Sequence, residues 1–297
     1  MAWEIEGLLL WSGHCHCSMC RKSNGTAFAT FAGGDARSFR WLGGEDLVSR
    51  YQSSLGSQRG FCSVCGAVVP GITADGAMVF LPLGNSDDEP GLAPQGHIYV
   101  GSKAPWFDLP DDGLPRFDVM PEDFGTPPEV PPPPGAPPAS RAGVLRGSCL
   151  CGAVAYETGP ARGLVYCHCE RCRKGRSGAF ASNIFAEAGP FRYTRGGDRV
   201  RAYKVPEAAR FTVAFCTACG GGVPRDPNGA PYLVVPAGSL DDDPGPLPRI
   251  HIFVGSKAPW YELGVDGLER CEDYPPGCAS SHEWVARQGR APSSAPK

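Results

Sequence analysis

The chain has 297 residues, a formal net charge of −3, 42% hydrophobic residues and 20% charged residues. This length suits about two domains of ~100 to 200 residues each, and the composition is that of a globular protein, which excludes a fully disordered chain. The slight acidity argues against a nucleic-acid partner, because nucleic-acid-binding proteins present a basic face to phosphate groups.

The N-terminal residues do not have the pattern of an export signal. Glu4 and Glu6 stand where a signal peptide needs Lys or Arg, and the apolar run at residues 8–11 is too short to span a bilayer. We therefore expect a cytoplasmic protein with no membrane partner. In a reducing compartment the 14 cysteines are expected to act first as thiolate ligands for metal.

A long segment of the chain occurs twice. Residues 97–106, HIYVGSKAPW, return at 251–260 as HIFVGSKAPW, an offset of 251 − 97 = 154 residues. A period of this length indicates two copies of a domain rather than a solenoid of small repeats. We assign the first copy to residues 1–120 and the second copy to residues 143–276.

Short apolar runs separated by Gly, Pro or Asp fill both copies. They lie at 77–81 and 97–100 in the first copy, and at 210–215, 232–235 and 250–254 in the second. Such runs predict β-strands, and no segment sustains a helical period over three turns. We predict a mainly β protein made of two mostly antiparallel domains, with at most a short helix after each CxCxxC motif.

Proline and small polar residues mark the segments outside the two copies. Residues 121–142 include four consecutive prolines at 131–134, which predict an extended spacer without a packed core. This linker is long enough to let the copies pair within one chain, although its stiffness could also hold them apart. Residues 277–297 are small and polar and predict a flexible tail.

The second copy holds three cysteine clusters, whose members are Cys149 and Cys151, then Cys167, Cys169 and Cys172, then Cys216 and Cys219. Residues two apart on a strand share a face, and a CxxCG turn presents two sulfurs together. Zinc takes four protein ligands in a structural site and three in a catalytic one, so seven thiolates divide into four and three. Grouping the CxC pair with the CxxCG pair leaves Cys167, Cys169 and Cys172 as the open site. Disulfides and iron–sulfur ligation are the less favoured alternatives.

The first copy repeats the three cysteines of the open site but only two of the four cysteines of the closed site. It has the triplet Cys15, Cys17 and Cys20 and the pair Cys62 and Cys65, but no CxC precedes them. We therefore expect one or two zinc ions here against two in the second copy. Ala2 aligns with Ala155, just after the place of the missing pair, so a misassigned start site is one hypothesis. A degenerate site that binds its structural metal poorly is the other. Phe117 replaces Cys271 in this copy, and we treat Cys271 and Cys278 as non-ligands.

These motifs resemble the glutathione-dependent formaldehyde-activating enzyme family, which includes centromere protein V. The resemblance spans nearly all of residues 143–276 and rests on GSCLCGAV at 147–154, the CxCxxC triplet followed by Arg-Lys, the CxxCG knuckle and GSLD at 238–241. It implies a Mss4-like zinc-binding β fold with structural zinc on Cys149, Cys151, Cys216 and Cys219. It also implies catalytic zinc on Cys167, Cys169 and Cys172, and by repetition on Cys15, Cys17 and Cys20.

The same resemblance implies a carbon–sulfur lyase that forms or breaks S-hydroxymethylglutathione, with glutathione as co-substrate and formaldehyde as the aldehyde. Arg173 and Lys174 follow the last ligand, where a cation could hold a glutathione carboxylate, and a solvated basic pair is the alternative. His97 and His251 are expected to be hydrogen-bonded structural residues. A scaffold or interaction module with purely structural zinc is the alternative function, which the centromere branch of the family allows.

Overall fold

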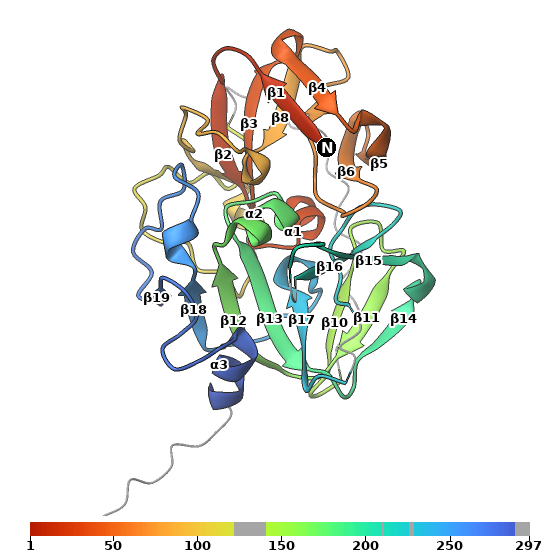
Figure 1. The fold of residues 1–297 in the computed structure, drawn as a ribbon, viewed down its shortest axis with the longest axis vertical. Helices are drawn as coiled ribbons and strands as arrows, with labels where there is room; N and C mark the ends of the chain where they lie inside the picture. The colour runs from red at the N-terminus through yellow and green to blue at the C-terminus, as the bar shows by residue number, and fades with distance from the viewer. Residues whose placement is uncertain (122–140, 209–210, 226–228, 289–297) are drawn as a thin grey trace, which may run out of the picture.

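A computed structural model of the chain describes residues 1–121, 141–208, 211–225 and 229–288 (Figure 1). It is mainly β, as the sequence predicts, and its two sheet-rich halves correspond to the two sequence copies. Nearly all of the spacer predicted at 121–142 lies outside the described residues. Within the described ranges, no helix has the length and apolar character needed to cross a membrane.

The first copy is built on a five-stranded sheet of order β7-β8-β3-β2-β9, with two separate strand pairs, β1-β4 and β5-β6. In this sheet β2 pairs antiparallel with β3 and parallel with β9. The elements are β1 (Ala2–Ile5), β2 (Trp11–Cys15), α1 (Ser18–Asn24), β3 (Ala29–Asp35), β4 (Phe39–Gly43), β5 (Val48–Ser54), β6 (Ser57–Cys62), β7 (Gly71–Ile72), β8 (Met78–Pro82) and β9 (His97–Ile98).

The second copy repeats this plan with a five-stranded sheet of order β17-β13-β12-β18-β19, beside β10-β11-β14 and β15-β16. Among the described strands most pairs are antiparallel, as predicted, and β12-β18 and β18-β19 are parallel. The elements are β10 (Leu145–Ser148), β11 (Ala155–Thr158), β12 (Ala161–Cys167), α2 (Glu170–Arg176), β13 (Ala181–Glu187), β14 (Arg192–Arg195), β15 (Val200–Lys204), β16 (Thr212–Cys216), β17 (Tyr232–Pro236), β18 (Arg249–Ile252), β19 (Glu269–Cys271) and α3 (Ser281–Gln288).

The short helix of each copy begins inside the CxCxxC motif rather than after it. Cys20 lies in α1 and Cys172 lies in α2. The backbone N–H of Cys20 donates to Cys17 Sγ at 3.3 Å, so a cysteine acts as the N-cap of α1. The sequence prediction of a following helix is therefore displaced by one turn.

The predicted flexible tail contains α3, which the sequence analysis missed. Trp284 and Val285 are buried in this helix, and a Cβ on Gly163 of β12 would lie 2.8 Å from the Trp284 ring. Two apolar residues in a polar segment are a weak sequence signal for a helix. They anchor this two-turn helix on the sheet because Gly163 has no side chain and leaves room for the Trp284 ring. The expectation of a flexible tail is wrong for this helix, and residues 289–297 lie outside the described residues.

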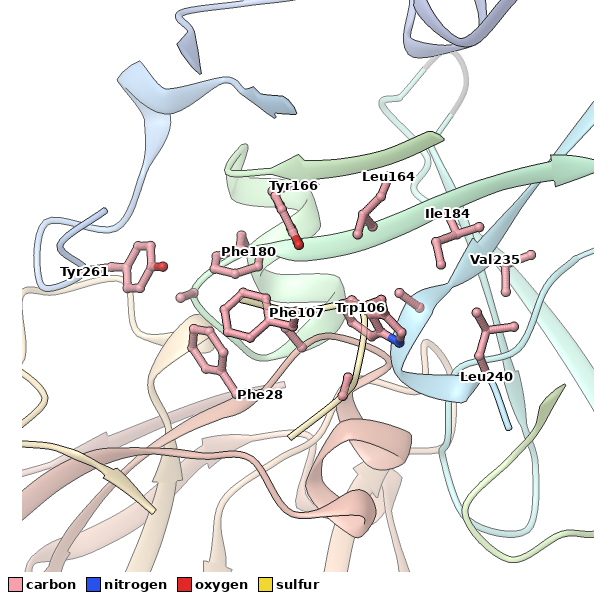
Figure 2. Close-up of a cluster of buried hydrophobic side chains, with 14 of the residues drawn as sticks. Phe28, Trp106, Phe107, Leu164, Tyr166, Phe180, Ile184, Val235, Leu240 and Tyr261 are labelled. Carbon is pink, nitrogen blue, oxygen red and sulfur yellow. The ribbon is translucent and has the colours of Figure 1, made fainter. Parts of the chain in front are cut away.

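The two copies share one hydrophobic core. Phe28 packs edge to face on its sequence counterpart Phe180, with ring centroids 5.3 Å apart, and Phe107 packs on Tyr166 at 6.1 Å (Figure 2). Trp106 and Trp260 are both buried in the same cluster. Because aromatic rings of both copies are buried against one another, the contact between the copies contributes to the hydrophobic stabilisation.

Glycines allow the backbones of the two copies to approach closely. A Cβ on Gly84 would lie 2.1 Å from the backbone nitrogen of Gly178, and a Cβ on Gly238 would lie 2.6 Å from the backbone nitrogen of Thr26, the equivalent of Gly178. Gly84 and Gly238 are equivalent in the two copies, so each contact repeats the other. Any side chain at these positions would separate the copies.

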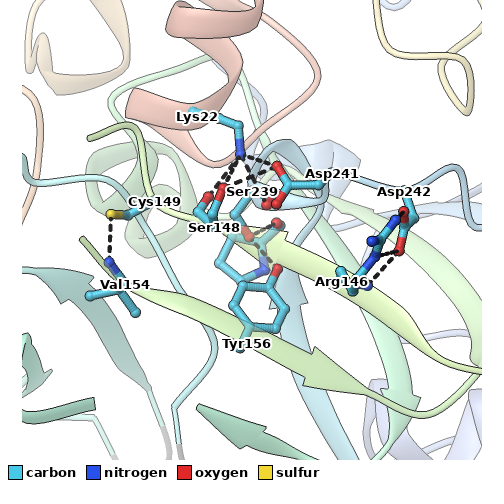
Figure 3. A network of polar contacts seen from close by, with 10 residues as sticks. Lys22, Arg146, Ser148, Cys149, Val154, Tyr156, Ser239, Asp241 and Asp242 are labelled. Carbon is cyan, nitrogen blue, oxygen red and sulfur yellow. Dashed lines mark hydrogen bonds and ion pairs between the residues drawn. The ribbon is translucent and has the colours of Figure 1, made fainter. Parts of the chain in front are cut away.

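Ion pairs also cross between the copies, and they are symmetric. Lys22 Nζ lies 2.6 Å from Asp241 Oδ1, and the equivalent Lys174 Nζ lies 2.5 Å from Asp87 Oδ1. Lys22 also donates to the carbonyl oxygen and the hydroxyl of Ser148 (Figure 3). The Lys22 pair is the less exposed of the two, so it is the less screened by solvent.

The shared core predicts that the two copies unfold together. Phe180→Ala is expected to lower the free energy of unfolding by ~3–5 kcal/mol, because it leaves a cavity in the core that both copies line. Urea unfolding followed by tryptophan fluorescence and by circular dichroism measures this effect. Leu55→Ala, at an 87% exposed position, is the control and should stay within ~0.5 kcal/mol of the parent. Two separate transitions in the parent protein would contradict the shared core.

Candidate metal centres

The sulfurs of Cys149, Cys151, Cys216 and Cys219 form one cluster in which all four lie within 4.8 Å of one another. Cys149 Sγ lies 3.5 Å from Cys151 Sγ, which lies 3.9 Å from Cys216 Sγ. Sulfurs bound at about 2.3 Å to one tetrahedral zinc ion lie about 3.8 Å apart. The cluster could therefore hold a metal ion with four protein ligands.

Local structure explains this convergence. The CxC pair follows β10 in a turn, Cys216 ends β16, and Cys219 lies in the turn that follows β16. The N–H of Val154 donates to Cys149 Sγ at 3.2 Å (Figure 3), and the N–H of Ala218 lies 3.4 Å from Cys216 Sγ. Such N–H groups stabilise thiolates, which are the metal-binding form of cysteine.

Each CxCxxC motif forms a second kind of centre, a three-cysteine cluster that we call a triad. The first triad is Cys15, Cys17 and Cys20, and the second triad is Cys167, Cys169 and Cys172; in each, the sulfurs lie within 4.8 Å of one another. The first cysteine ends a central strand, β2 or β12, and the third lies in the first turn of the helix that follows. The strand-to-helix turn thus brings together the three sulfurs that the sequence analysis grouped.

Neither triad has a fourth ligand of the usual kinds. Over the parts of the chain that the structure describes, no other His, Cys, Asp or Glu joins the three sulfurs. Three thiolates suit a soft divalent ion such as zinc, and three protein ligands leave one coordination position for another molecule. The two triads therefore differ from the four-cysteine cluster, which supplies a complete tetrahedral set.

Hydrogen bonds between the thiols shift the pKa values of the triad cysteines. In the second triad the thiols of Cys167 and Cys172 lower the pKa of Cys169 to about 3. In the first triad it is the pKa of Cys20 that lies well below its usual value, because Cys15 and Cys17 donate to it and Arg59 lies beside it. In each triad a thiol that accepts hydrogen bonds from its neighbours is stabilised as a thiolate, which is the metal-binding form of cysteine.

Cys62 and Cys65 form only a pair. Hydrogen bonding from the Cys65 thiol lowers the pKa of Cys62 to about 5. Both residues line a cavity together with Met1 and Trp3, and no described His, Asp, Glu or further Cys completes a metal site there. Cys271 on β19 and Cys278 also lie outside the described cysteine clusters.

The arginine and the lysine that follow each triad differ in their contacts. Lys174 contacts Asp87 and Glu170, so its ammonium group is engaged between the copies. Arg173 is half-buried, and burial lowers the pKa of its guanidinium although the nearby charges of Glu170 and Cys169 oppose that shift. The Nε atoms of Arg173 and of its equivalent Arg21 are buried and have no hydrogen-bond partner among the described residues. The arginines, rather than the lysines, keep hydrogen-bonding capacity beside the triads.

A buried histidine chain supports each triad, and the sequence analysis did not identify it as a chain. His16 Nε2 lies 2.9 Å from His97 Nδ1, whose Nε2 lies 2.8 Å from Asp112 Oδ2. The second copy repeats both contacts, at 2.8 Å and 2.7 Å, with His168, His251 and Asp266. The hydrogen-bonded structural role expected for His97 and His251 is confirmed. The signal for the chain was present, since an Asp follows each of these histidines by 15 residues.

These chains connect the triads to the shared core. His16, which lies between two triad cysteines, stacks on Phe107 with centroids 6.0 Å apart, and His168 stacks on Tyr261 at 6.0 Å. Burial, followed by the charge of the neighbouring histidine, lowers the pKa of His16 and of His168 to about 3. Both rings are therefore neutral near pH 7 and hold the CxCxxC loops in place.

The sequence was compared with known families and proteins. The model of the family described as "Glutathione-dependent formaldehyde-activating enzyme" matches residues 2–102 and again residues 144–256. A crystal structure of a Rhodobacter sphaeroides protein, a Northeast Structural Genomics target, is 27% identical over 35% of this chain and 98% of that chain, with a TM-score of 0.27. No curated protein matches the sequence.

The three clusters predict three divalent ions per chain. Cys169→Ser and Cys216→Ser should each lower the zinc content by one, and Cys216→Ser should cost more stability because it opens a closed site. Cys62→Ser is the matched control and should leave the metal content unchanged. Elemental analysis of the purified variants measures this content. Loss of metal from Cys62→Ser, or none from Cys169→Ser, would contradict the assignment.

The buried histidines predict loss of stability in mild acid. Burial, which outweighs the opposing effect of Asp266, lowers the pKa of His251 below its usual 6.5. The unfolded state therefore takes up a proton first, so the free energy of unfolding falls as the pH drops below about 6.5. Urea unfolding between pH 7.5 and 5.5 should show a shallower slope for His251→Gln than for the parent or for Leu55→Ala. Equal slopes would contradict the prediction.

Proposed function

The chain belongs to the glutathione-dependent formaldehyde-activating enzyme family, and on this premise we propose that it is a zinc-dependent carbon–sulfur lyase of the reducing cytoplasm. Its reaction would join a thiol to an aldehyde, with glutathione and formaldehyde as the first candidates. The thiol sulfur adds to the carbonyl carbon, and the thiol proton ends on the carbonyl oxygen, which yields an S-hydroxymethyl adduct. The reverse reaction breaks the same carbon–sulfur bond.

The observation that carries this proposal is the pair of triads to which no fourth His, Cys, Asp or Glu ligand is added by the described residues. A scaffold protein needs only closed metal sites such as the four-cysteine cluster. The two triads would each leave one coordination position of a bound metal ion open. Such a position is useful when the metal ion binds the sulfur of a substrate. Zinc, when held by three thiolates, supplies a position at which a thiol loses its proton more readily.

The residues of the chain itself would bind and orient the thiol substrate. Arg21 and Arg173 lie directly after the last cysteine of each triad, and their buried Nε atoms are unpartnered within the described residues. A substrate carboxylate, such as those of glutathione, would pair with these guanidinium groups. Lys174 is less suited to this role because Asp87 and Glu170 already engage it.

The pairing of the copies would serve the same chemistry. The histidine chains connect each CxCxxC loop to rings of the shared core, so both triads depend on one packing contact. We expect the two copies to act as a pseudo-dimer within one chain, with the spacer joining them covalently. Such an arrangement holds the cysteine ligands in place before the metal or the substrate binds.

Magnetisation-exchange NMR on glutathione and formaldehyde tests the proposal, because the uncatalysed reaction gives a measurable background. The zinc-loaded protein should exceed that background by at least about tenfold, and the double variant Cys17→Ser/Cys169→Ser should return to it with the fold retained by circular dichroism. Cys271→Ser, outside the clusters, is the matched control and should keep full activity. A zinc-loaded parent protein without exchange above background would favour the non-catalytic scaffold.

A further inference from the structure

The two triads face different residues on the strand that leads to each CxxC knuckle. Arg59 on β6 precedes Cys62 by three residues, and Val213 on β16 precedes Cys216 by three residues. Arg59 lies opposite Tyr51 in its strand pair, as Val213 lies opposite the equivalent Tyr203. Arg59 and Val213 therefore occupy the same place in the two copies.

In the first copy this place holds a cation against the triad. Arg59 Nη1 and Nη2 donate to Cys20 Sγ at 3.7 Å and 3.6 Å. The Nε atom of Arg59 is buried and has no hydrogen-bond partner within the described part of the chain. An arginine guanidinium stays protonated in proteins even where it is buried. The guanidinium is thus a fixed positive charge beside the sulfurs.

The second triad has an apolar surface at the same position. Val213 is buried, and Phe211 packs against the cluster that contains Cys167 and Cys172. No arginine of the described ranges hydrogen-bonds to a sulfur of this triad, and Arg210 lies outside those ranges. Glu170 and Arg171 replace Ser18 and Met19 in the second motif, but both are exposed and their opposite charges offset each other.

A second difference also makes the surroundings of the first triad more polar than those of the second. Tyr99 packs against the first triad, whereas Phe253 stands at the equivalent position of the second copy. Both adopt a left-handed backbone conformation with φ of 57°, so their rings leave the chain in the same way. The Tyr99 side chain carries a hydroxyl that can donate a hydrogen bond, whereas the Phe253 side chain has none.

Charge balance gives these differences a function. One divalent ion and three thiolates carry 2 − 3 = −1, so an incoming thiolate meets like charge unless a cation is near. We propose that the first triad is the thiolate-accepting site of the chain and that Arg59 is the residue that determines this preference. The second triad, whose cluster Phe211 contacts and whose equivalent of Arg59 is Val213, is the weaker site for thiols and favours a neutral ligand.

This inference rests on the proposed function, since it needs a divalent ion in each triad. It goes further by assigning unequal roles to two motifs of the same cysteine spacing. The second copy has the four-cysteine cluster, but this cluster does not make the second triad the stronger site for thiols. The closed cluster contributes to stability, whereas the neighbours of the triad determine its ligand.

Cobalt(II) in place of the native ion tests the proposal without turnover, because its visible and near-ultraviolet absorption changes when a thiolate joins the metal. Cys169→Ser isolates the first triad and Cys17→Ser isolates the second, with cobalt content measured in each. Glutathione is the first probe, and 2-mercaptoethanol, which has no carboxylate, is the second. The first-triad protein should bind both thiols about tenfold more tightly than the second-triad protein.

Substitutions at the distinguishing position complete the test. In the first-triad protein, Arg59→Gln should remove the tenfold advantage, whereas Arg59→Lys should keep most of it because the charge remains. Arg50→Gln, at an exposed position on the adjacent β5, is the matched control and should change nothing. In the second-triad protein, Val213→Arg should strengthen thiol binding, and Arg210→Gln should leave it unchanged.

The outcomes separate this inference from the function on which it rests. Equal thiol affinity of the two triads, or an affinity of Arg59→Gln within twofold of its parent, overturns the role of Arg59 and leaves the lyase proposal intact. Absence of any thiol-induced spectral change in both cobalt-loaded proteins overturns the lyase proposal as well. If Arg59→Gln fails to fold, Arg59→Lys and Val213→Arg still decide the question, and a Val213→Arg protein with unchanged affinity counts against the inference.

Discussion

The packing of Phe28 on Phe180 is the contact on which the rest of the molecule depends. These two rings are equivalents in the duplicated sequence, and they meet where the two copies join. Glycines at 84 and 238 let the backbones approach, and ion pairs of Lys22 and Lys174 flank the contact. A chain with a duplicated domain can thus bury an aromatic surface that either copy alone would expose to water.

The two triads are connected to this contact through buried histidines. His16 and His168 lie between triad cysteines, and each stacks on a ring of the shared core. Each also hydrogen-bonds to a second histidine, which in turn hydrogen-bonds to an aspartate. The cysteine loops are therefore supported from inside the protein. Three sulfurs held close together before metal binding lose little conformational freedom when the ion arrives.

Duplication also allowed the copies to diverge while the cysteine spacing stayed the same. The second copy has the complete four-cysteine cluster, and the first copy has Arg59 and Tyr99 beside its triad. The four-cysteine cluster of the second copy contributes to stability, whereas Arg59 and Tyr99 of the first copy change the charge and polarity around a metal. Two sites with identical ligands can in this way serve different ligands, because the surroundings of a metal determine what its open position accepts.

Much of this protein could be predicted from its sequence. The spacing of the cysteines determined the four-and-three partition, because residues two apart on a strand and three apart in a helical turn bring sulfurs together locally. The period of the repeat likewise determined that there are two β-rich halves. Local geometry is sufficient for each triad, which is one short motif. The four-cysteine cluster joins motifs in which Cys151 and Cys216 lie 65 residues apart, and its prediction also needed the coordination number of zinc.

Only the tertiary structure decided which distant residues complete the sites. Arg59 lies 39 residues from Cys20, and His16 lies 81 residues from His97, so no local pattern connects them. The buried helix α3 and the engagement of Lys174 by Asp87 were missed for the same reason. Their positions follow from how the sheets and the two copies pack, and that packing is a property of the whole chain rather than of any segment.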